Sequence, residues 1–331
     1  MLESWLRRFG AHTASYVLLE GNKEYLTLPS VDGFVAWETR WGCPVIAGDP
    51  VCAQRDAPQL LAALRRRAFP RPVLAYSVSP VFRDAFSEAG FDAVPIGAEA
   101  TFDPSRFTLA GGARAVLRSA VNHATKAGLT VRQHDPLAPG AAATSAELST
   151  LSRAWLAAKG EDELGFLLGQ PVLDRPTAKR TFVARGVNRV EGFLVCEPVF
   201  ARRGWYLDVT RRQPDAVRGT MELLTATALQ TFGAEGATFA SMGLAPLARL
   251  DANDAPPSDS PALSTLCRRA YSRLRRPYDY RDLARYKAKY APDAWEHRLL
   301  CYSGPVAEWV IRIALGVAIF LAPANEPLAS A

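Results

Sequence analysis

Short β-rich runs alternate with helical segments along the chain, and this alternation restricts the fold more than any other feature of the sequence. Residues 25–28, 33–37 and 44–48 have strand composition and are separated by Gly, Pro and Asp. Leucines at helical spacing predict a helix over 59–67, and an apolar run predicts a buried strand over 73–78. The first part of the chain is therefore predicted to be mixed α and β with antiparallel strands.

The alternation continues beyond a segment that is poor in bulky side chains. Residues 136–146 are rich in Pro, Gly and Ala, which predicts a link between two halves. A helix over 112–127 precedes this link and has glycines at both ends. Beyond the link, helices are predicted over 147–159, 219–232, 267–274 and 280–290, and strands over 180–185, 190–198, 205–209 and 237–242.

The composition is that of an ordinary globular protein. Of 331 residues, 49% are apolar and 22% are charged, which excludes a disordered chain, a collagen-like chain and a multi-span membrane protein. The five cysteines and four histidines are scattered without a CxxC pair, so neither a zinc site nor a disulfide framework is predicted. The first ten residues lack the apolar core of a signal peptide, and a reducing, cytosolic environment fits best.

The formal net charge of +6 is concentrated in one segment. Residues 268–298 contain ten Lys and Arg against four Asp and Glu, with five tyrosines interleaved. Basic and aromatic side chains together can bind a single-stranded RNA end through charge and stacking. The same mixture suits an anionic membrane surface, and a solvated basic helix is the third interpretation.

Residues 205–224 form the most informative motif, a strand that ends in polar residues, a loop with arginines and a helix that opens at Gly219 and Thr220. Free backbone N–H groups at a helix N-terminus bind phosphate or carboxylate, and nearby arginines add charge. The layout resembles the strand–loop–helix with which GNAT-type acyltransferases hold the pyrophosphate of coenzyme A. Arg211, Arg212 and Arg218 stand in place of the glycine-rich form of that loop. This departure favours a phosphate-bearing acyl carrier other than coenzyme A.

An ordered series of short motifs resembles the C-terminal catalytic domain of bacterial phosphatidylglycerol lysyltransferases and alanyltransferases, the multiple peptide resistance factor family. The series spans residues 25–302. Its members are GFVAW at 33–37, GDPV at 48–51, GAEA at 97–100, FTL at 107–109 leading into RAVLR at 114–118, WLAAK at 155–159, FLLG at 166–169, LDVTR at 207–211, GTMELL at 219–224, SMGLAPL at 241–247 and YKAKY at 286–290.

The resemblance implies an α+β protein built as a tandem of two GNAT-like acyltransferase folds with a C-terminal apolar helix. The expected division is an N-terminal domain over 1–135, a C-terminal domain with the main site over 136–303, and an apolar tail over 304–331. The family moves an aminoacyl group from aminoacyl-tRNA to a lipid hydroxyl, usually on phosphatidylglycerol. Leu167 replaces the serine of the family's Phe-Ser-Leu-Gly run, so the amino acid selected is expected to differ. The family's multi-span flippase module is not expected in this chain.

By matching position, the resemblance assigns catalytic roles to Glu99, Asp208, Arg211 and Lys287. An aminoacyl ester is already activated, so the reaction requires neither a metal nor another cofactor. The enzyme must position a hydroxyl, help to remove its proton and stabilise an oxyanion. Asp208 or Glu222 is expected to hold the substrate ammonium or act as base, Arg211 to bind phosphate, and Lys287 to pair with phosphate or the oxyanion. The expected substrate-binding residues are Gly219, Thr220, Glu222, Ser241, Met242, Arg114, Arg118 and Arg218.

The tail after Pro305 is strongly apolar from Ile313 and is shorter than the roughly 20 residues that a spanning helix needs. It is predicted to be an interfacial anchor, with a short tilted span or a packed helix as alternatives. The predicted partners are aminoacyl-tRNA, a membrane phospholipid and the membrane surface, contacted through residues 268–322 at the cytoplasmic face. The alternatives are an acyltransferase that uses acyl-CoA, and a membrane- or RNA-binding relative without catalysis. The oligomeric state is left open.

Overall fold

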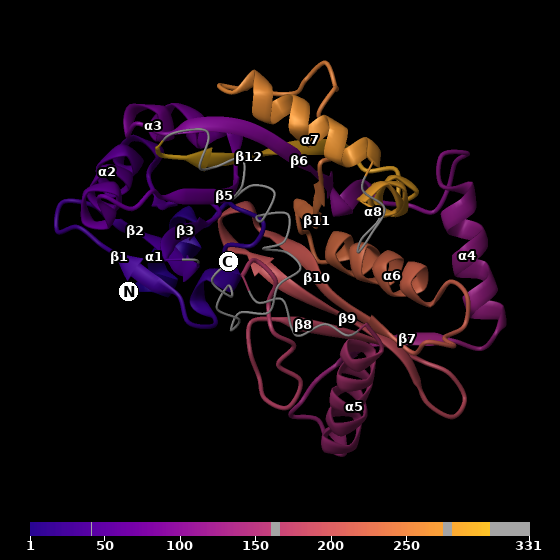
Figure 1. Cartoon of the computed structure of the whole chain (residues 1–331). Helices are drawn as coiled ribbons and strands as arrows, with labels where there is room; N and C mark the ends of the chain where they lie inside the picture. Colours follow the sequence, from indigo (N-terminus) through magenta and orange to yellow (C-terminus); the bar gives the residue numbers. More distant parts are fainter. Residues whose placement is uncertain (41, 160–165, 274–279, 305–331) are drawn as a thin grey trace.

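The computed structural model describes residues 1–40, 42–159, 166–273 and 280–304 (Figure 1). Within these ranges, twelve strands join in one sheet, in the order β1-β2-β3-β5-β12-β6-β11-β10-β9-β8-β7, with β4 paired to β2. The strands are β1 (Glu24–Leu26), β2 (Gly33–Arg40), β3 (Cys43–Ala47), β4 (Val51–Cys52), β5 (Leu74–Val78), β6 (Asp92–Phe102), β7 (Thr130–His134), β8 (Arg180–Arg185), β9 (Val190–Val199), β10 (Gly204–Arg212), β11 (Phe239–Pro246) and β12 (Ala294–Tyr302).

Helices cover both faces of the sheet (Figure 1). The α-helices are α1 (Leu2–Phe9), α2 (Ala57–Ala68), α3 (Arg83–Glu88), α4 (Ala115–Lys126), α5 (Ala141–Lys159), α6 (Thr220–Ala234), α7 (Pro261–Arg273) and α8 (Tyr280–Ala288). The 3₁₀ helices are η1 (Tyr16–Leu19), η2 (Gln54–Asp56), η3 (Pro80–Phe82), η4 (Pro104–Arg106) and η5 (Phe200–Arg202).

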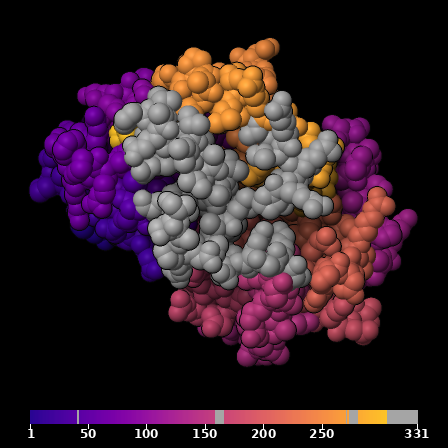
Figure 2. All heavy atoms as spheres, viewed as in Figure 1, coloured from indigo at the N-terminus to yellow at the C-terminus, as the bar shows by residue number. Residues whose placement is uncertain are grey.

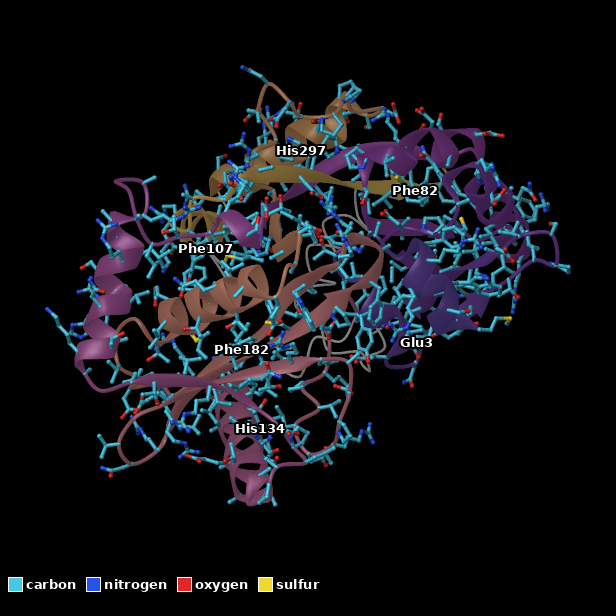
Figure 3. The ribbon with its side chains drawn as sticks, turned by 180° about the vertical axis from the view of Figure 1, so that it is seen from behind. Glu3, Phe82, Phe107, His134, Phe182 and His297 are labelled. Atoms are coloured by element: carbon cyan, nitrogen blue, oxygen red, sulfur yellow. The ribbon has the colours of Figure 1, made fainter. Side chains whose placement is uncertain are left out.

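The strands of the second half alternate between two cores. On β8, Phe182 and Ala184 belong to the core beneath α4 and α6, together with Phe107 (Figure 3). The intervening Val183 packs with Leu148 and Leu151 of α5 on the other face. This period of two is the pattern that a sheet buried on both faces requires. The two cores fix α5 and α6 on opposite sides of β8, β9 and β10.

The two halves of the chain share strands. β12, close to the C-terminal end of the described chain, lies between β5 and β6 and is antiparallel to both, with His297 opposite Ala98 and Leu299 opposite Val78. β6 in turn pairs with β11 of the second half, with Thr101 opposite Ser241. β7 pairs with β8 along its whole length. One sheet thus runs through both halves of the chain. The domain limits at 135/136 and 303/304 therefore stay a prediction.

Most predicted elements are present, with two differences. The second part of the predicted link is wrong, since α5 begins at Ala141 and only residues 136–140 remain outside it. The sequence did not predict β6, β7 or β12, and two of these are central strands. Within the described ranges, no helix combines the length and apolar character of a membrane span. The predicted apolar helix at 305–331 lies outside those ranges.

Candidate active site

A cavity of about 290 Å³ lies where the N-terminal segment, β6, β10, β11, α5 and α8 meet. The face seen in Figure 1 carries α7 at its upper edge and α5 at its lower edge, and Figure 2 shows the same face in spheres. The four residues to which the sequence assigned catalysis all line this cavity, from two strands and one helix. They are Glu99, Asp208, Arg211 and Lys287.

Asp208 owes its position to a β-bulge. The register of β10 against β9 shifts between Leu207 and Val209, so Asp208 is the additional residue in the strand. A bulge of this kind redirects a side chain out of the regular pleat. The carboxylate oxygen Oδ2 accepts a hydrogen bond of 2.6 Å from the backbone N–H of Gly169. Burial raises the pKa of Asp208 to about 7, although the Gly169 N–H and the Tyr206 hydroxyl act to lower it.

Glu99 is a buried carboxylate at the centre of a hydrogen-bond network. Its oxygen Oε2 accepts from Thr13 Oγ1 at 2.5 Å, from Ser241 Oγ at 3.1 Å and from Arg298 Nη2 at 3.0 Å. Burial acts to raise the pKa of Glu99, but the charges of Arg298 and His12 and the hydrogen bonds lower it overall. Glu99 is therefore an anion, and Arg298, only 2% exposed, is the cation that stabilises it.

Lys287 lines the cavity from α8 and binds the backbone of a second bulge, in β11. The register of β11 against β6 shifts between Ser241 and Leu244. The ammonium nitrogen of Lys287 donates to the carbonyl oxygens of Gly243 and Leu244, each at 2.7 Å. Burial lowers the pKa of Lys287 to about 7, against the opposing effects of the Glu99 and Asp208 charges. Near neutral pH this amine can therefore exist with or without its proton.

Arg211 lies beside an aromatic ring from α5. Its guanidinium carbon is 4.0 Å from the ring centroid of Trp155, which is a cation–π contact. Its Nη1 also donates to the carbonyl oxygen of Thr210 at 3.1 Å. Trp155 and its neighbour Leu156 line the cavity with Arg211. This part of the cavity therefore offers a stacked, planar cation suited to phosphate.

The eight predicted substrate-binding residues fall into two groups, those at the cavity and those away from it. Met242 lines the cavity, and Ser241 lies directly beneath it, bonded to Glu99. The other six lie outside the cavity lining, so their contact with substrate stays a prediction. They are Arg114, Arg118, Arg218, Gly219, Thr220 and Glu222.

The N-terminus of α6 is packed against α4. Gly219 has a φ of +92°, and a Cβ there would be 2.1 Å from the carbonyl oxygen of Ala120. The N–H and hydroxyl of Thr220 both donate to the carbonyl oxygen of Val217. Glu222 is paired with Lys289. The Thr220 N–H and the Glu222 side chain at the helix start are thus already bonded within the protein, which does not favour the coenzyme A alternative.

Two of the predicted arginines tie loops to α4. Arg114 donates from Nε and Nη2 to the carbonyl oxygens of Tyr290 and Ala291, both at 2.9 Å. Arg118 donates to those of Leu109 and Gly111, at 2.7 and 2.9 Å. Arg218 is exposed. Both side chains therefore donate to backbone carbonyl oxygens of neighbouring loops.

Sequence reasoning missed the N-terminal contribution to the cavity. His12 and Thr13 precede η1 and line the cavity. His12 Nε2 is 2.7 Å from the carbonyl oxygen of Ser77, and its Nδ1 accepts from the N–H of Ala14 at 3.1 Å. Ser77 itself has a φ of +65°, an uncommon conformation outside glycine. No short motif signals this arrangement, because the segments that form it are more than sixty residues apart.

No group of three or more potential metal ligands occurs among the residues that the structure describes. The cavity instead combines two carboxylates, an amine and a guanidinium within largely apolar walls. Such a set can hold charged groups and move a proton.

The mixed α/β fold is shared with solved structures. A C-terminal domain of a lysylphosphatidylglycerol synthetase from Agrobacterium fabrum matches with a TM-score of 0.76 and 23% identity, covering 95% of this chain and 96% of that one. The L-PGS structure from Bacillus licheniformis matches with a TM-score of 0.77 and 22% identity, covering 97% and 96%.

Residues 4–302 match the family described as phosphatidylglycerol lysyltransferase, C-terminal, and the chain belongs to this family. The bifunctional lysylphosphatidylglycerol biosynthesis protein LysX of Mycolicibacterium vanbaalenii is 28% identical over 293 residues, or 87% of this chain. The phosphatidylglycerol lysyltransferase of Staphylococcus aureus strain N315 is 24% identical over 310 residues, or 93% of this chain. The matched regions cover 26% and 36% of the lengths of these two relatives.

Proposed function

We propose that this protein transfers an aminoacyl group from aminoacyl-tRNA to a hydroxyl of a membrane lipid, with phosphatidylglycerol as the first candidate. Membership of the phosphatidylglycerol lysyltransferase family supports the reaction class. The observation that carries the proposal is the convergence of Glu99, Asp208, Arg211 and Lys287 on one cavity. These residues lie between positions 99 and 287 of the sequence, and only Asp208 and Arg211 are on the same element, β10.

The cavity supplies the groups that the transfer requires. Asp208, with a pKa raised to about 7, accepts the proton of the lipid hydroxyl as that oxygen attacks the ester carbonyl. The new C–O bond gives a tetrahedral intermediate, and its collapse breaks the bond to the ribose oxygen of the tRNA, which takes the proton back from Asp208. Protonated Lys287 stabilises the oxyanion of the intermediate. Glu99, held as an anion, binds the α-ammonium group, and Arg211 binds a phosphate of tRNA or lipid.

We propose that the protein works at the cytoplasmic face of the membrane, because both the acceptor and the donor must reach one cavity. The basic segment from 268 to 322 is the proposed membrane contact and includes the end of α7, all of α8 and residues outside the described ranges. Lys and Arg attract anionic headgroups, and Tyr is favoured at the membrane interface. The tail at 305–322 is proposed to add an interfacial anchor.

A tandem of two GNAT-like folds is the proposed origin of the single sheet. In each half, antiparallel strands lead to one parallel pair that is connected through a helix. These pairs are β3 with β5, joined through α2, and β10 with β11, joined through α6. In both halves the next strand is antiparallel and comes from elsewhere in the chain, as β12 beside β5 and β6 beside β11.

The proposal is tested by transfer of a labelled amino acid to lipid. The full chain is incubated with labelled aminoacyl-tRNAs and vesicles of phosphatidylglycerol, and the lipid fraction is analysed. We expect a labelled lipid whose formation is lost in Asp208→Asn and in Lys287→Met, with both variants folded by circular dichroism. Absence of labelled lipid with every amino acid contradicts the function, and full activity of both variants contradicts the site.

A further inference from the structure

We infer that Lys179 and Glu197 are positioning residues that hold the 166–170 loop, and through it Asp208, in place, and that the charge of Lys179 favours the ionised form of Asp208. The inference rests on the proposed function in taking Asp208 as the proton acceptor. Neither residue lines the cavity, and neither belongs to the motifs that the sequence singled out. Both lie in the second half, Glu197 on β9 and Lys179 directly before β8.

Lys179 is a buried cation with oxygen partners on three residues. Its Nζ lies 2.8 Å from Glu197 Oε1, 2.6 Å from Glu20 Oε1 and 2.7 Å from the carbonyl oxygen of Gln170. The side chain of Lys179 is 1% exposed and that of Glu197 is fully buried. Buried charges are retained only when they are paired, so this arrangement is a specific contact rather than a surface ion pair.

The same cluster fixes the loop that covers Asp208. The N–H of Gly169 donates to Asp208, and the N–H of Gln170 donates to Glu20 Oε2 at 3.1 Å. A Cβ at Gly169 would be 1.7 Å from Glu197 Oε1, so the loop backbone lies directly on that carboxylate. Leu167, Leu168 and Gly169 all line the cavity. Lys179 and Glu197 therefore shape one wall of the cavity through the loop and also face its proton acceptor.

The charges around Asp208 come from several elements. Burial raises the pKa of Glu197 to about 8, and the charge of Asp208 raises it as well, so the two carboxylates oppose each other's ionisation. Lys179 lowers the pKa of Asp208 and Glu20 raises it. Burial opposes the charge of Lys179, but Glu197 and Glu20 outweigh it and raise the pKa of Lys179. The remaining groups that face Asp208 are Tyr206 and Arg211 of β10, Cys196 of β9 and Lys287 of α8.

These charges predict different effects for two substitutions. Lys179→Met removes a cation that lowers the pKa of Asp208, so Asp208 loses its proton at higher pH and the acidic limb of the rate profile moves up by about one pH unit. Glu197 keeps its proton below about pH 8 and is neutral while Asp208 titrates, so Glu197→Gln is expected to leave the limb in place and to lower activity through the loop. The double variant is expected to show the same limb as Lys179→Met. A role limited to folding would lower activity in Lys179→Met without moving the limb.

The experiment measures the initial rate against pH with labelled aminoacyl-tRNAs and phosphatidylglycerol vesicles, for the full chain and four variants. Glu191→Gln is the matched control, because Glu191 is a buried carboxylate of the same strand that is paired with Arg189 and lies outside the cavity lining. We expect this control to leave the profile unchanged. The inference is overturned if Lys179→Met leaves the limb in place or moves it down, or if Glu197→Gln has wild-type activity.

A second measurement is independent of turnover. Deuterium exchange of peptides that cover 166–173 is expected to be faster in Lys179→Met than in wild type, and unchanged in Glu191→Gln. Equal exchange in wild type and Lys179→Met refutes the positioning of the loop. A wild-type protein that forms no labelled lipid contradicts the proposed function alone, while the exchange result still decides the role of Lys179.

Discussion

Replacing Arg298 by Met tests whether the candidate site is held together by a buried ion pair. Arg298 is 2% exposed, and its Nη2 lies 3.0 Å from Glu99 and 3.2 Å from Glu296. Glu296 keeps a second cation in the variant, because Arg202 binds both of its oxygens at 2.7 and 2.9 Å. Glu99 retains only the hydroxyls of Thr13 and Ser241 as neutral donors.

The expected cost follows from the carboxylate that is left behind. Removing one partner of a buried pair destabilises a protein by about 3–5 kcal/mol, because an uncompensated charge remains. Burial then raises the pKa of Glu99 without the opposing charge of Arg298. In wild type the lowered pKa of Glu99 contributes stability that is fully present above the unfolded pKa, so this contribution is kept from pH 8 to pH 5. In the variant the raised pKa of Glu99 destabilises the fold, and this cost disappears as pH falls and Glu99 takes up a proton. The difference between wild type and variant is therefore expected to shrink from pH 8 to pH 5.

Urea unfolding followed by tryptophan fluorescence measures this difference as a free energy of unfolding. The same substitution is made in a Glu99→Gln background, where no charge is left unpaired by the loss of Arg298. We expect Arg298→Met to cost at least about 2 kcal/mol less in that background, which is the coupling energy of the pair. An equal cost in both backgrounds, or a cost that does not change with pH, would refute the electrostatic explanation of this network.

Three further outcomes are expected. Gly219→Ala should lower the free energy of unfolding by about 1–3 kcal/mol, because a φ of +92° and the carbonyl oxygen of Ala120 both oppose a side chain there. The control is Gly236→Ala, which has a positive φ as well but open space for a side chain, and it should lower the free energy of unfolding by less. Trp155→Ala should raise the Michaelis constant for aminoacyl-tRNA more than it lowers the turnover number, since it removes the ring beneath Arg211. An unchanged Michaelis constant would contradict a role of Trp155 in substrate binding. The five cysteines are free and buried, so a thiol reagent should label none of them until urea unfolds the chain, and labelling of the native protein would show that a thiol is accessible.

Local sequence patterns were sufficient to predict most of the helices and strands. Strands β8 and β9 lie within one residue of their predicted limits, since their alternating apolar side chains are buried against α5 and α6. β6 was not predicted, although Glu99 on that strand was. Glycine, proline and glutamate interrupt its apolar pattern, and they are accommodated because the strand is central and bulged.

The site residues were predictable one by one, but the arrangement around them was not. The resemblance gave Glu99, Asp208, Arg211 and Lys287, and all four line the cavity. Their supporting partners are remote in the sequence: Arg298 reaches Glu99 across 199 residues. Glu197 did carry a usable signal, as one carboxylate in the otherwise apolar run LVCEPV at 194–199. A charge in a strand that is buried along its whole length requires a buried partner, and Lys179 is that partner.

The place of β12 in the sheet has a consequence for biosynthesis. β5 and β6 are separated by the width of one strand, which is filled by residues 294–302. During translation, the edges of β5 and β6 that pair with β12 therefore stay unpaired until residues 294–302 have been made. Unpaired edges invite pairing with other chains, and contacts between distant segments form slowly. We expect a nascent chain that stops before Ala294 to depend on chaperones, and its release from them to coincide with the arrival of the strand that carries Arg298.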